Sequence, residues 1–146
     1  MSVSQISVFL ENRPGELAEI TGLLAAQNID LRALNIAETT DYGVIRLITN
    51  CNDEAARSLN EAGFILFRNE VTAVAVPDQP GGLNRVLKLL AAAGIDIAYM
   101  YSIFSESKGK AFMIRKLSDS ARAEALLEAA GLAGIVPGTD ALVGKE

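Results

Sequence analysis

The sequence predicts an α+β protein made of two tandem βαββαβ modules, each an antiparallel sheet with helices on one face. Three observations predict this fold. The chain repeats itself at a fixed spacing, and each copy alternates strand-like and helix-like hydrophobic patterns. Half of the 146 residues are apolar and 21% are charged, which is typical of a globular protein. We expect the modules to span residues 1–70 and 71–146.

The repeat is clearest in the turn before the first predicted helix of each copy. Asn12–Leu17 reads NRPGEL, and Asp78–Leu83, 66 positions later, reads DQPGGL. The same spacing, without a gap, aligns further segments: Leu23–Ala26 with Leu89–Ala92, Ile29-Asp30 with Ile95-Asp96, and Gly43 with Gly109. Leu and Ala recur by chance in amphipathic helices, but Pro-Gly-x-Leu, Ile-Asp and Gly in one register do not. The chain therefore holds two copies of one unit.

The first copy begins with a strand over residues 5–10, because Ile6, Val8 and Leu10 alternate with polar residues. Residues 12–15 form a turn, and we expect Pro14 at the first helical position, where its missing N–H costs nothing. Helical spacing then directs three apolar side chains inward and two acidic ones to water. These are Leu17, Ile20 and Leu24, and Glu16 and Glu19.

The rest of the first copy predicts two paired strands, a helix and a closing strand. Residues 29–38 and 44–49 form a hairpin around a turn at 40–43. Asn52 is expected to cap a short helix that stops at Gly63, and residues 64–69 form the closing strand.

The second copy follows without a Gly/Ser-rich or Pro-rich spacer. Residues 64–76 read as an almost continuous strand, so we expect the modules to be rigidly coupled, with their sheets merged or adjacent. The expected elements are a helix over 80–93, strands over 95–104 and 111–115, a helix from a cap at Ser118 to Gly131, a weak strand over 132–136 and a loose tail over 138–146.

The order βαββαβ is that of the ferredoxin-like split unit. Its second sheet face should be polar where water covers it. Val71–Val76 and Ile97–Phe104 instead read as apolar on both faces. A chance excess of small apolar residues would explain this pattern, but we favour an open face that is covered in an oligomer.

Composition excludes several classes of partner. The chain has 13 basic and 18 acidic residues and a pI near 4.8, so it lacks the basic field that nucleic acids or anionic membrane surfaces attract. Its apolar runs are too short to span a membrane. Residues 1–5 are polar and lead directly into a strand, so we expect no signal peptide.

The chain contains no histidine, which excludes His-based triads, His zinc ligands and the commonest general base. Cys51, the single cysteine, fits a reducing cytoplasm, and we expect it to be a small buried strand residue rather than a reactive thiol. The sequence has neither a P-loop nor a G-x-G-x-x-G motif. We therefore expect a protein that is not an enzyme and holds no cofactor or metal.

The candidate binding site is the strand-to-helix loop that occurs twice. Gly15 and Gly81 are expected where a helix begins, with its unpaired N–H groups and positive dipole end. A carboxylate can dock there because glycine allows close approach. Asn12 and Asp78 hold equivalent positions and can accept hydrogen bonds from an ammonium group. A Pro-Gly pair is often only a turn, but its recurrence at one place in both copies favours a site for a zwitterion.

These motifs resemble the ACT domain, an amino-acid sensor attached to many metabolic enzymes. The resemblance rests on strand–x-x-Pro-Gly-x-Leu–helix–Asn/Gly-Ile-Asp–strand and covers residues 3–136. Small stand-alone tandem-ACT proteins are more similar still, on Val76–Leu83, Gly94–Ile97 and Tyr99-Met100-Tyr101. The resemblance implies an amino-acid-binding, allosteric regulatory protein. Because no catalytic domain is evident on this chain, the effector is expected to act through assembly, as a homodimer, or on a separate metabolic enzyme.

The resemblance also implies where the amino acid binds, namely between the loop of one module and the second strand of a neighbouring module. The loop residues are Asn12, Arg13, Pro14, Gly15, Glu16 and Leu17, and Asp78, Gln79, Pro80, Gly81, Gly82 and Leu83. The strand residues are Asp30, Leu31, Asn35, Asp96, Tyr99 and Tyr101. Tyr99 and Tyr101 are equally well explained by sheet packing, and Asp30 and Asp96 better by closing a turn. Because Arg13 and Glu16 become Gln79 and Gly82, the two sites need not share a ligand.

Two other functions fit the same fold. A regulatory subunit that clamps an enzyme without any ligand would use the apolar sheet face, and co-purification with a second protein would identify it. An acylphosphatase-like hydrolase needs an Arg and an Asn in its anion loop, a role open to Arg13 and Asn12, but the second copy keeps neither. A metal carrier of this fold would need two cysteines in its first loop, and they are absent.

Overall fold

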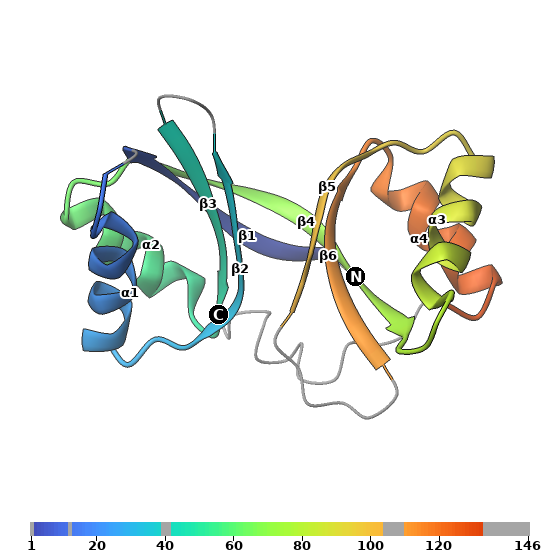
Figure 1. Ribbon diagram of the computed structural model, residues 1–146, viewed down its shortest axis with the longest axis horizontal. Helices are drawn as coiled ribbons and strands as arrows, with labels where there is room; N and C mark the ends of the chain where they lie inside the picture. The colour runs from blue at the N-terminus through green and yellow to red at the C-terminus, as the bar shows by residue number, and fades with distance from the viewer. Residues whose placement is uncertain (1, 12, 39–41, 104–109, 133–146) are drawn as a thin grey trace. The chain divides into compact units, whose positions relative to one another are not determined.

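The computed structural model describes residues 2–11, 13–38, 42–103 and 110–132 (Figure 1). The chain divides into two compact units. The first unit spans Ser4–Asn69, and the second unit starts at Glu70 and also takes the residues before Ser4. Each unit is described by itself below.

Ten elements follow one another in the order βαββαβαββα. Those that begin in the first half of the chain are β1 (Ser2–Glu11), α1 (Glu16–Ala26), β2 (Leu31–Glu38), β3 (Tyr42–Thr49), α2 (Asn52–Glu61) and β4 (Leu66–Pro77). Those that follow are α3 (Gly82–Ala92), β5 (Ile97–Ser102), β6 (Lys110–Leu117) and α4 (Ser120–Ala129). The strand β4 carries the chain from the first unit into the second.

The sheets of the two units have the same strand order. In the first unit β3 lies between β2 and β1, and β4 follows β1. In the second unit β6 lies between β5 and β4. The paired strands are antiparallel, with Ile6 opposite Leu47 in β1 and β3, and Val74 opposite Met113 in β4 and β6. This is the order of two tandem ferredoxin-like modules.

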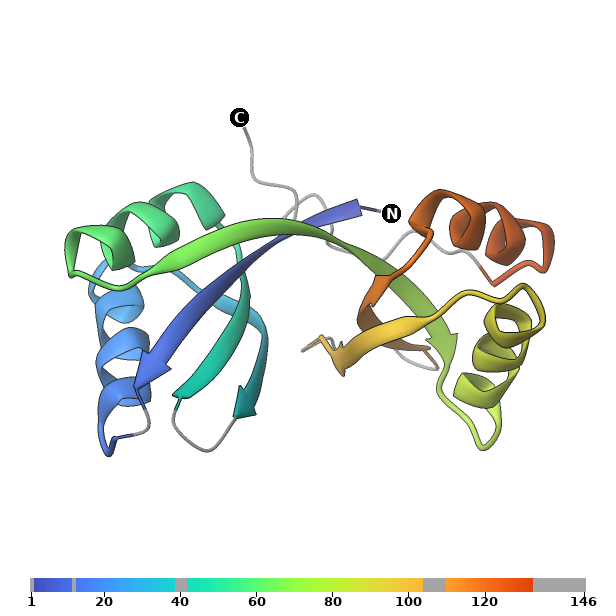
Figure 2. The ribbon, with the colours of Figure 1, turned by 90° about the horizontal axis from the view of Figure 1, so that it is seen from above.

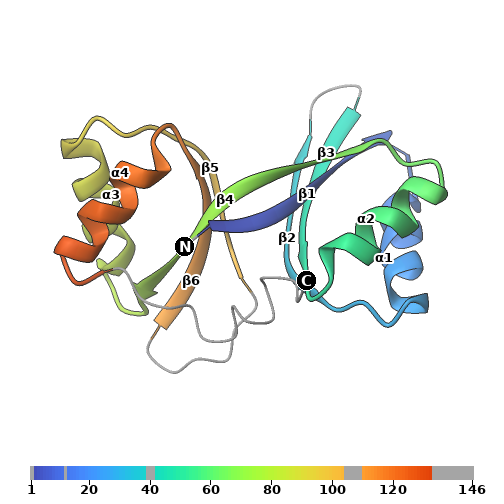
Figure 3. The ribbon, with the colours of Figure 1, turned by 180° about the vertical axis from the view of Figure 1, so that it is seen from behind.

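Two helices cover one face of the sheet in each unit, α1 and α2 in the first and α3 and α4 in the second (Figures 2 and 3). Each unit has its own core between helices and sheet. Ile6, Ile20, Leu24, Leu47 and Leu59 are almost fully buried in the first core. In the second core the corresponding layer includes Val86, Leu90 and Leu127. Ile20 and Leu24 of α1 and the alternate residues of β1 thus face the core, as their spacing in the sequence predicted.

Several local predictions are wrong for identifiable reasons. The first helix begins at Glu16 rather than at Pro14. Gly15 adopts a left-handed conformation, which an α-helix cannot include, so the helix starts only after it. Asp119, not Ser118, caps α4, and its carboxylate accepts a hydrogen bond from the Arg122 N–H. Cys51 is only half-buried and sits at the start of α2 rather than within a strand.

Two strands were predicted to be apolar on both faces. Val71–Val76 are buried along their whole length. In β5 Ala98 and Ser102 are exposed, and the covering of such a face in an oligomer stays a prediction. The predicted end of that strand at Phe104, the turn residues 40 and 41, the closing strand beyond Leu132 and the tail over 138–146 lie outside the described residues.

The repeat extends to the corner where each first helix leads into its next strand. In the first unit Asp30 and Asn50 exchange two hydrogen bonds, Asp30 N–H to Asn50 Oδ1 (2.9 Å) and Asn50 N–H to the Asp30 carbonyl (3.0 Å). In the second unit Asp96 and Ser118 do the same, at 3.1 Å in each direction. On the side of Asp30 and Asp96 these bonds use backbone atoms, so the two carboxylates take no part in them.

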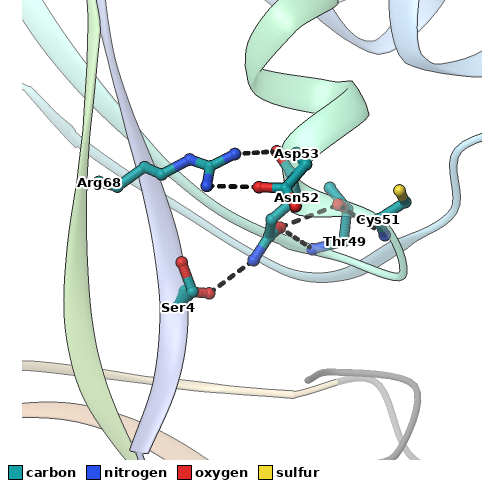
Figure 4. A network of polar contacts seen from close by, with 6 residues as sticks. All are labelled: Ser4, Thr49, Cys51, Asn52, Asp53 and Arg68. Carbon is teal, nitrogen blue, oxygen red and sulfur yellow. Dashed lines mark hydrogen bonds and ion pairs between the residues drawn. The ribbon is translucent and has the colours of Figure 1, made fainter. Parts of the chain in front are cut away.

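A polar network joins β1, β3 and α2 around the buried Asn52 (Figure 4). The Asn52 amide donates to the Ser4 carbonyl (2.7 Å), and its Oδ1 accepts from the Thr49 N–H (3.0 Å) and hydroxyl (2.9 Å). Arg68 donates to the Asn52 carbonyl and pairs with Asp53. Asn52 was predicted to cap α2, but it is the first residue of the helix and links the strand ends instead.

None of the described helices is long and apolar enough to cross a membrane. Within the described ranges, no group of three or more histidine, cysteine, aspartate or glutamate side chains is arranged to hold a metal ion.

We predict that Asn52→Ala lowers the free energy of unfolding by about 1–3 kcal/mol, because it strands the Ser4 carbonyl and the Thr49 donors in a buried place. Urea unfolding followed by circular dichroism measures this loss. Asn60→Ala, on the exposed face of the same helix, is the matched control and should change stability by less than about 0.5 kcal/mol. Equal effects of the two substitutions would contradict a structural role for the network.

Candidate functional site

The first of the two candidate loops joins β1 to α1. Its chain turns at once after the strand, since the Arg13 N–H donates to the Glu11 carbonyl at 2.9 Å. Gly15 then takes a left-handed conformation (φ 87°, ψ −9°) and forms the N-cap of α1. The helix starts when the Glu19 N–H donates to the Gly15 carbonyl at 2.9 Å. The loop thus presents the open first turn of α1.

The second loop, between β4 and α3, repeats this backbone almost angle for angle. The Gln79 N–H donates to the Pro77 carbonyl at 2.9 Å, and Gly81 is the N-cap with φ 83° and ψ −6°. The Arg85 N–H donates to the Gly81 carbonyl at 3.1 Å. The shared Pro-Gly motif therefore encodes one loop conformation twice.

The backbone favours glycine at both N-caps, because most other L-residues rarely adopt a positive φ. It also leaves the helix start open. A Cβ built at Gly15 or Gly81 would have no heavy atom within 4 Å apart from its chain neighbours. The space beside each cap is thus free to receive a group that approaches the first-turn N–H groups.

The loops differ at the residue after the cap. In the second loop this residue is Gly82, where an added Cβ would lie 2.0 Å from the Pro77 carbonyl oxygen. The strand end and the helix start therefore touch there, and only glycine fits. In the first loop the equivalent residue is Glu16, which carries a side chain where the second loop has the close contact between Gly82 and the Pro77 carbonyl.

Glu16 was predicted to face water, and this prediction is wrong: the residue is only 7% exposed. As the first residue of α1 its side chain turns back toward the start of the helix, where Arg13 lies. Arg13 Nε is 3.6 Å from Glu16 Oε2 and 3.3 Å from Glu11 Oε2. Glu16 Oε2 is buried and has no hydrogen-bond partner among the residues that the structure describes.

A pocket of about 340 Å³ opens beside this carboxylate, inside the first unit. Three glutamates, Glu11, Glu16 and Glu19, line it together with Arg13 and Tyr42. The end of β1 and the turn between α2 and β4 complete the lining, with Phe9, Leu10, Ala62, Gly63, Phe64 and Ile65. Sequence reasoning missed Glu11, which directly precedes the predicted loop, because it was read only as the end of a strand. It missed Tyr42 and this turn because they are distant from the loop in the chain and share no periodic pattern with it.

The second unit has a differently charged pocket by its own helices. It measures about 320 Å³ and is lined by Arg85, Lys88, Leu89 and Ala130. Arg85 occupies the repeat position of Glu19, and Lys88 that of Gly22. The two units therefore carry opposite charge beside their first helices.

The predicted loop residues fall into three groups. Asn12 lies outside the described residues. Five residues line the exposed surface of the loops, namely Pro14, Gly15, Asp78, Pro80 and Gly81, and Arg13 and Gln79 are exposed beside them. Leu17 packs against the first core, whereas Leu83 is 36% exposed.

The strand residues are not brought to the loop of their own unit. Leu31 starts β2, directly after Asp30, at the opposite end of the sheet from Glu11. The Asn35 side chain accepts a hydrogen bond from Arg46 at 2.9 Å. In the second unit the Asp96 N–H donates to the Ser118 hydroxyl, and Tyr99 stacks on Tyr101 with ring centroids 6.4 Å apart. A site that combines these strands with a loop requires a neighbouring module.

A family model described as an ACT domain pair matches residues 1–133. The crystal structure of protein BT0572 from Bacteroides thetaiotaomicron is similar, with 36% sequence identity, a TM-score of 0.84 and coverage of 91% of each chain. Two regulatory subunits of aspartate kinase share the fold. That from Thermus thermophilus, in its ligand-free form, has 18% identity and a TM-score of 0.66, covering 88% of this chain and 91% of its own. That from Thermus flavus has 16% and 0.64, covering 90% and 92%. Comparison with curated protein sequences finds no match.

We predict that Gly82→Ala destabilises the protein by about 1–3 kcal/mol, because the added methyl group must displace the Pro77 carbonyl. Gly22→Ala is the matched control: it lies inside α1 with open space at its Cβ, so it should stabilise by up to about 1 kcal/mol. Chemical unfolding of both variants against the wild type measures the difference. A Gly82→Ala protein as stable as the wild type would show that the strand and helix do not touch at this point.

Proposed function

The chain belongs to the ACT domain-pair family, and from this membership we propose that it is a regulatory protein that binds a small amino acid and is not an enzyme. The observation that supports this proposal is the pair of glycine-capped loops. Gly15 and Gly81 hold the same left-handed conformation within a few degrees and leave the same open space at a helix start.

The chemistry of the loops suits the two charges of an amino acid. The ligand carboxylate docks on the first-turn N–H groups, where the helix dipole favours negative charge. In the second loop the exposed Asp78 carboxylate is available to the ammonium group. The proposed sites comprise residues 12–17 and 78–83, and a neighbouring module supplies strand residues equivalent to Asn35 or Tyr99. Because Glu16 and Gly82 differ in size and charge, we expect the two sites to prefer different ligands.

Composition supports a regulatory rather than a catalytic role. The chain has no histidine, and the two carboxylates nearest to Arg13 pair with it instead of forming an acid–base pair with each other. The acylphosphatase-like alternative would need Arg13 free for a phosphoryl group. The single cysteine, Cys51, is unpaired, and we propose a reducing, cytoplasmic location on this ground.

We propose that the ligand acts through assembly, as a homodimer, or through a separate enzyme. Phe9, Ile65 and Phe67 lie on the sheet face away from the first core and are 41%, 71% and 47% exposed. The Phe9 and Phe67 rings lie 5.7 Å apart, so they form one apolar patch. This patch also favours the second candidate function, an interaction module that clamps its partner without a ligand.

We predict that Gly15→Asn and Gly81→Asn each remove one amino-acid site while the fold persists. Asn tolerates a positive φ, and the chain itself uses Asn28 (φ 55°) where the second copy has Gly94 (φ 68°). The added side chain fills the open space at the helix start. Isothermal calorimetry should show a lower stoichiometry for each variant, with the ligand first chosen by thermal shift. A ligand at 100 times its Kd stabilises by about 2.7 kcal/mol.

Gly94→Asn is the control for these variants, since it places the same residue at a left-handed position outside the loops. It should bind like the wild type. Unchanged stoichiometry in both loop variants would mean that the loops are structural turns only.

We predict that the protein is a homodimer or larger at micromolar concentration, and that a saturating amino acid changes its assembly but not its helix content. A ligand can shift an equilibrium only by its differential affinity, typically worth 1–3 kcal/mol. Light scattering and circular dichroism with and without ligand test this. A strict monomer, or a large gain of helix at constant mass, would contradict it.

A further inference from the structure

The Glu16 pocket contains a buried carboxylate oxygen that forms no hydrogen bond with the described residues. Glu16 is more than nine-tenths buried, and its Oε2 has no hydrogen bond in the described part of the chain. A buried carboxylate without a hydrogen bond is unfavourable unless a cation or donor reaches it. The α1 dipole favours acidic residues in the first turn, which accounts for the exposed Glu19. It gives no reason for Glu16 to be buried in the wall of a pocket.

Arg13 meets this carboxylate only loosely. Its Nε lies 3.6 Å from Glu16 Oε2, which is longer than a hydrogen bond, and its side chain is 63% exposed. The same Nε is shared with Glu11 at 3.3 Å. The Arg13–Glu11 pair is exposed on both sides and contributes little. The guanidinium group therefore lies near the Glu16 carboxylate without a close contact to it.

Acidic side chains outnumber basic ones around the pocket. Three glutamates face one arginine among its lining residues. The pocket also adjoins Ala62 and Gly63, where α2 has just ended, so the negative end of that helix dipole adds to the same field. The repeat position in the second unit carries Arg85 in place of Glu19, so this acidic character belongs to the first unit alone.

The size and the apolar lining of the pocket limit the ligand. At about 340 Å³ it is at the small end of ligand sites. The end of β1 and the turn after α2 add apolar residues to the lining, among them Leu10 and Phe64, which also pack against the first core. A short alkyl chain that ends in an ammonium group matches both kinds of lining residue.

We propose that the first-unit pocket binds a small organic cation, whose primary ammonium group takes the place of the Arg13 guanidinium at the Glu16 carboxylate. The pocket shares Arg13 and Glu16 with the proposed amino-acid site at residues 12–17, but it lies within one unit and needs neither the open space at Gly15 nor a neighbouring module. The inference therefore goes beyond the proposed amino-acid sites, and a cation that carries no carboxylate tests it separately.

The test uses n-butylamine as the cation, n-butanol as its neutral analogue and butyrate as its anionic analogue, with the full-length ¹⁵N-labelled protein. In amide NMR spectra butylamine should shift the resonances of Glu19, Tyr42 and Gly63 in a saturable way. Butanol should bind at least tenfold more weakly, and butyrate should produce no saturable shift. None of the three is a zwitterion, so this result is separate from amino-acid binding at the loops.

Two substitutions of opposite sign make the test specific. Glu16→Gln, which keeps the size of the side chain, should weaken butylamine binding at least tenfold. Arg13→Gln removes the competing cation and should strengthen binding severalfold, an effect that damage to the fold would not produce. Glu128→Gln and Arg57→Gln, exposed residues outside the pocket lining, are the matched controls and should leave the affinity unchanged. Equal binding of butanol, no effect of Glu16→Gln, or weaker binding in Arg13→Gln would overturn the proposal.

Discussion

The left-handed glycine at the start of the first helix in each unit is the constraint on which both loops depend. Because Gly15 and Gly81 hold a positive φ, each helix excludes the glycine and the proline before it. The helix begins at the residue after the glycine. The cap itself carries no side chain, so the space beside it is open. The same angle thus decides where α1 and α3 start and leaves this space open in both units.

The residue after each cap turns this shared geometry into two different surfaces. Gly82 lets the end of β4 touch the start of α3, which leaves no room for a side chain. Glu16 occupies the corresponding place in the first unit, and its burial brings a carboxylate to the wall of a pocket. At this position the second copy has a tight backbone contact and the first has a carboxylate in the wall of a pocket. The two copies share the loop conformation and differ in the residues beside it.

Much of the fold could be predicted from the sequence, because periodicity and the fixed 66-residue spacing report directly on elements and their order. The core positions of Ile6, Ile20 and Leu24 follow from the same patterns. The failures concern residues whose environment is made by distant segments. Glu16 resembles a solvent-facing helix residue until the turn after α2 and the end of β1 enclose it. Asn52 resembles a cap until Ser4 and Thr49 meet its amide. Neither contact has a local sequence signal.

The central claim is that the two glycine-capped loops are the places where this ACT domain pair meets its ligand. Amide chemical shifts of the ¹⁵N-labelled protein, recorded through a titration with the amino acid that stabilises it most, test this claim most directly. The account predicts saturable shifts concentrated at residues 13–18 and 79–84, with small changes elsewhere in each unit. Shifts centred on Phe9, Ile65 and Phe67, or no saturable shift in either loop, would contradict it.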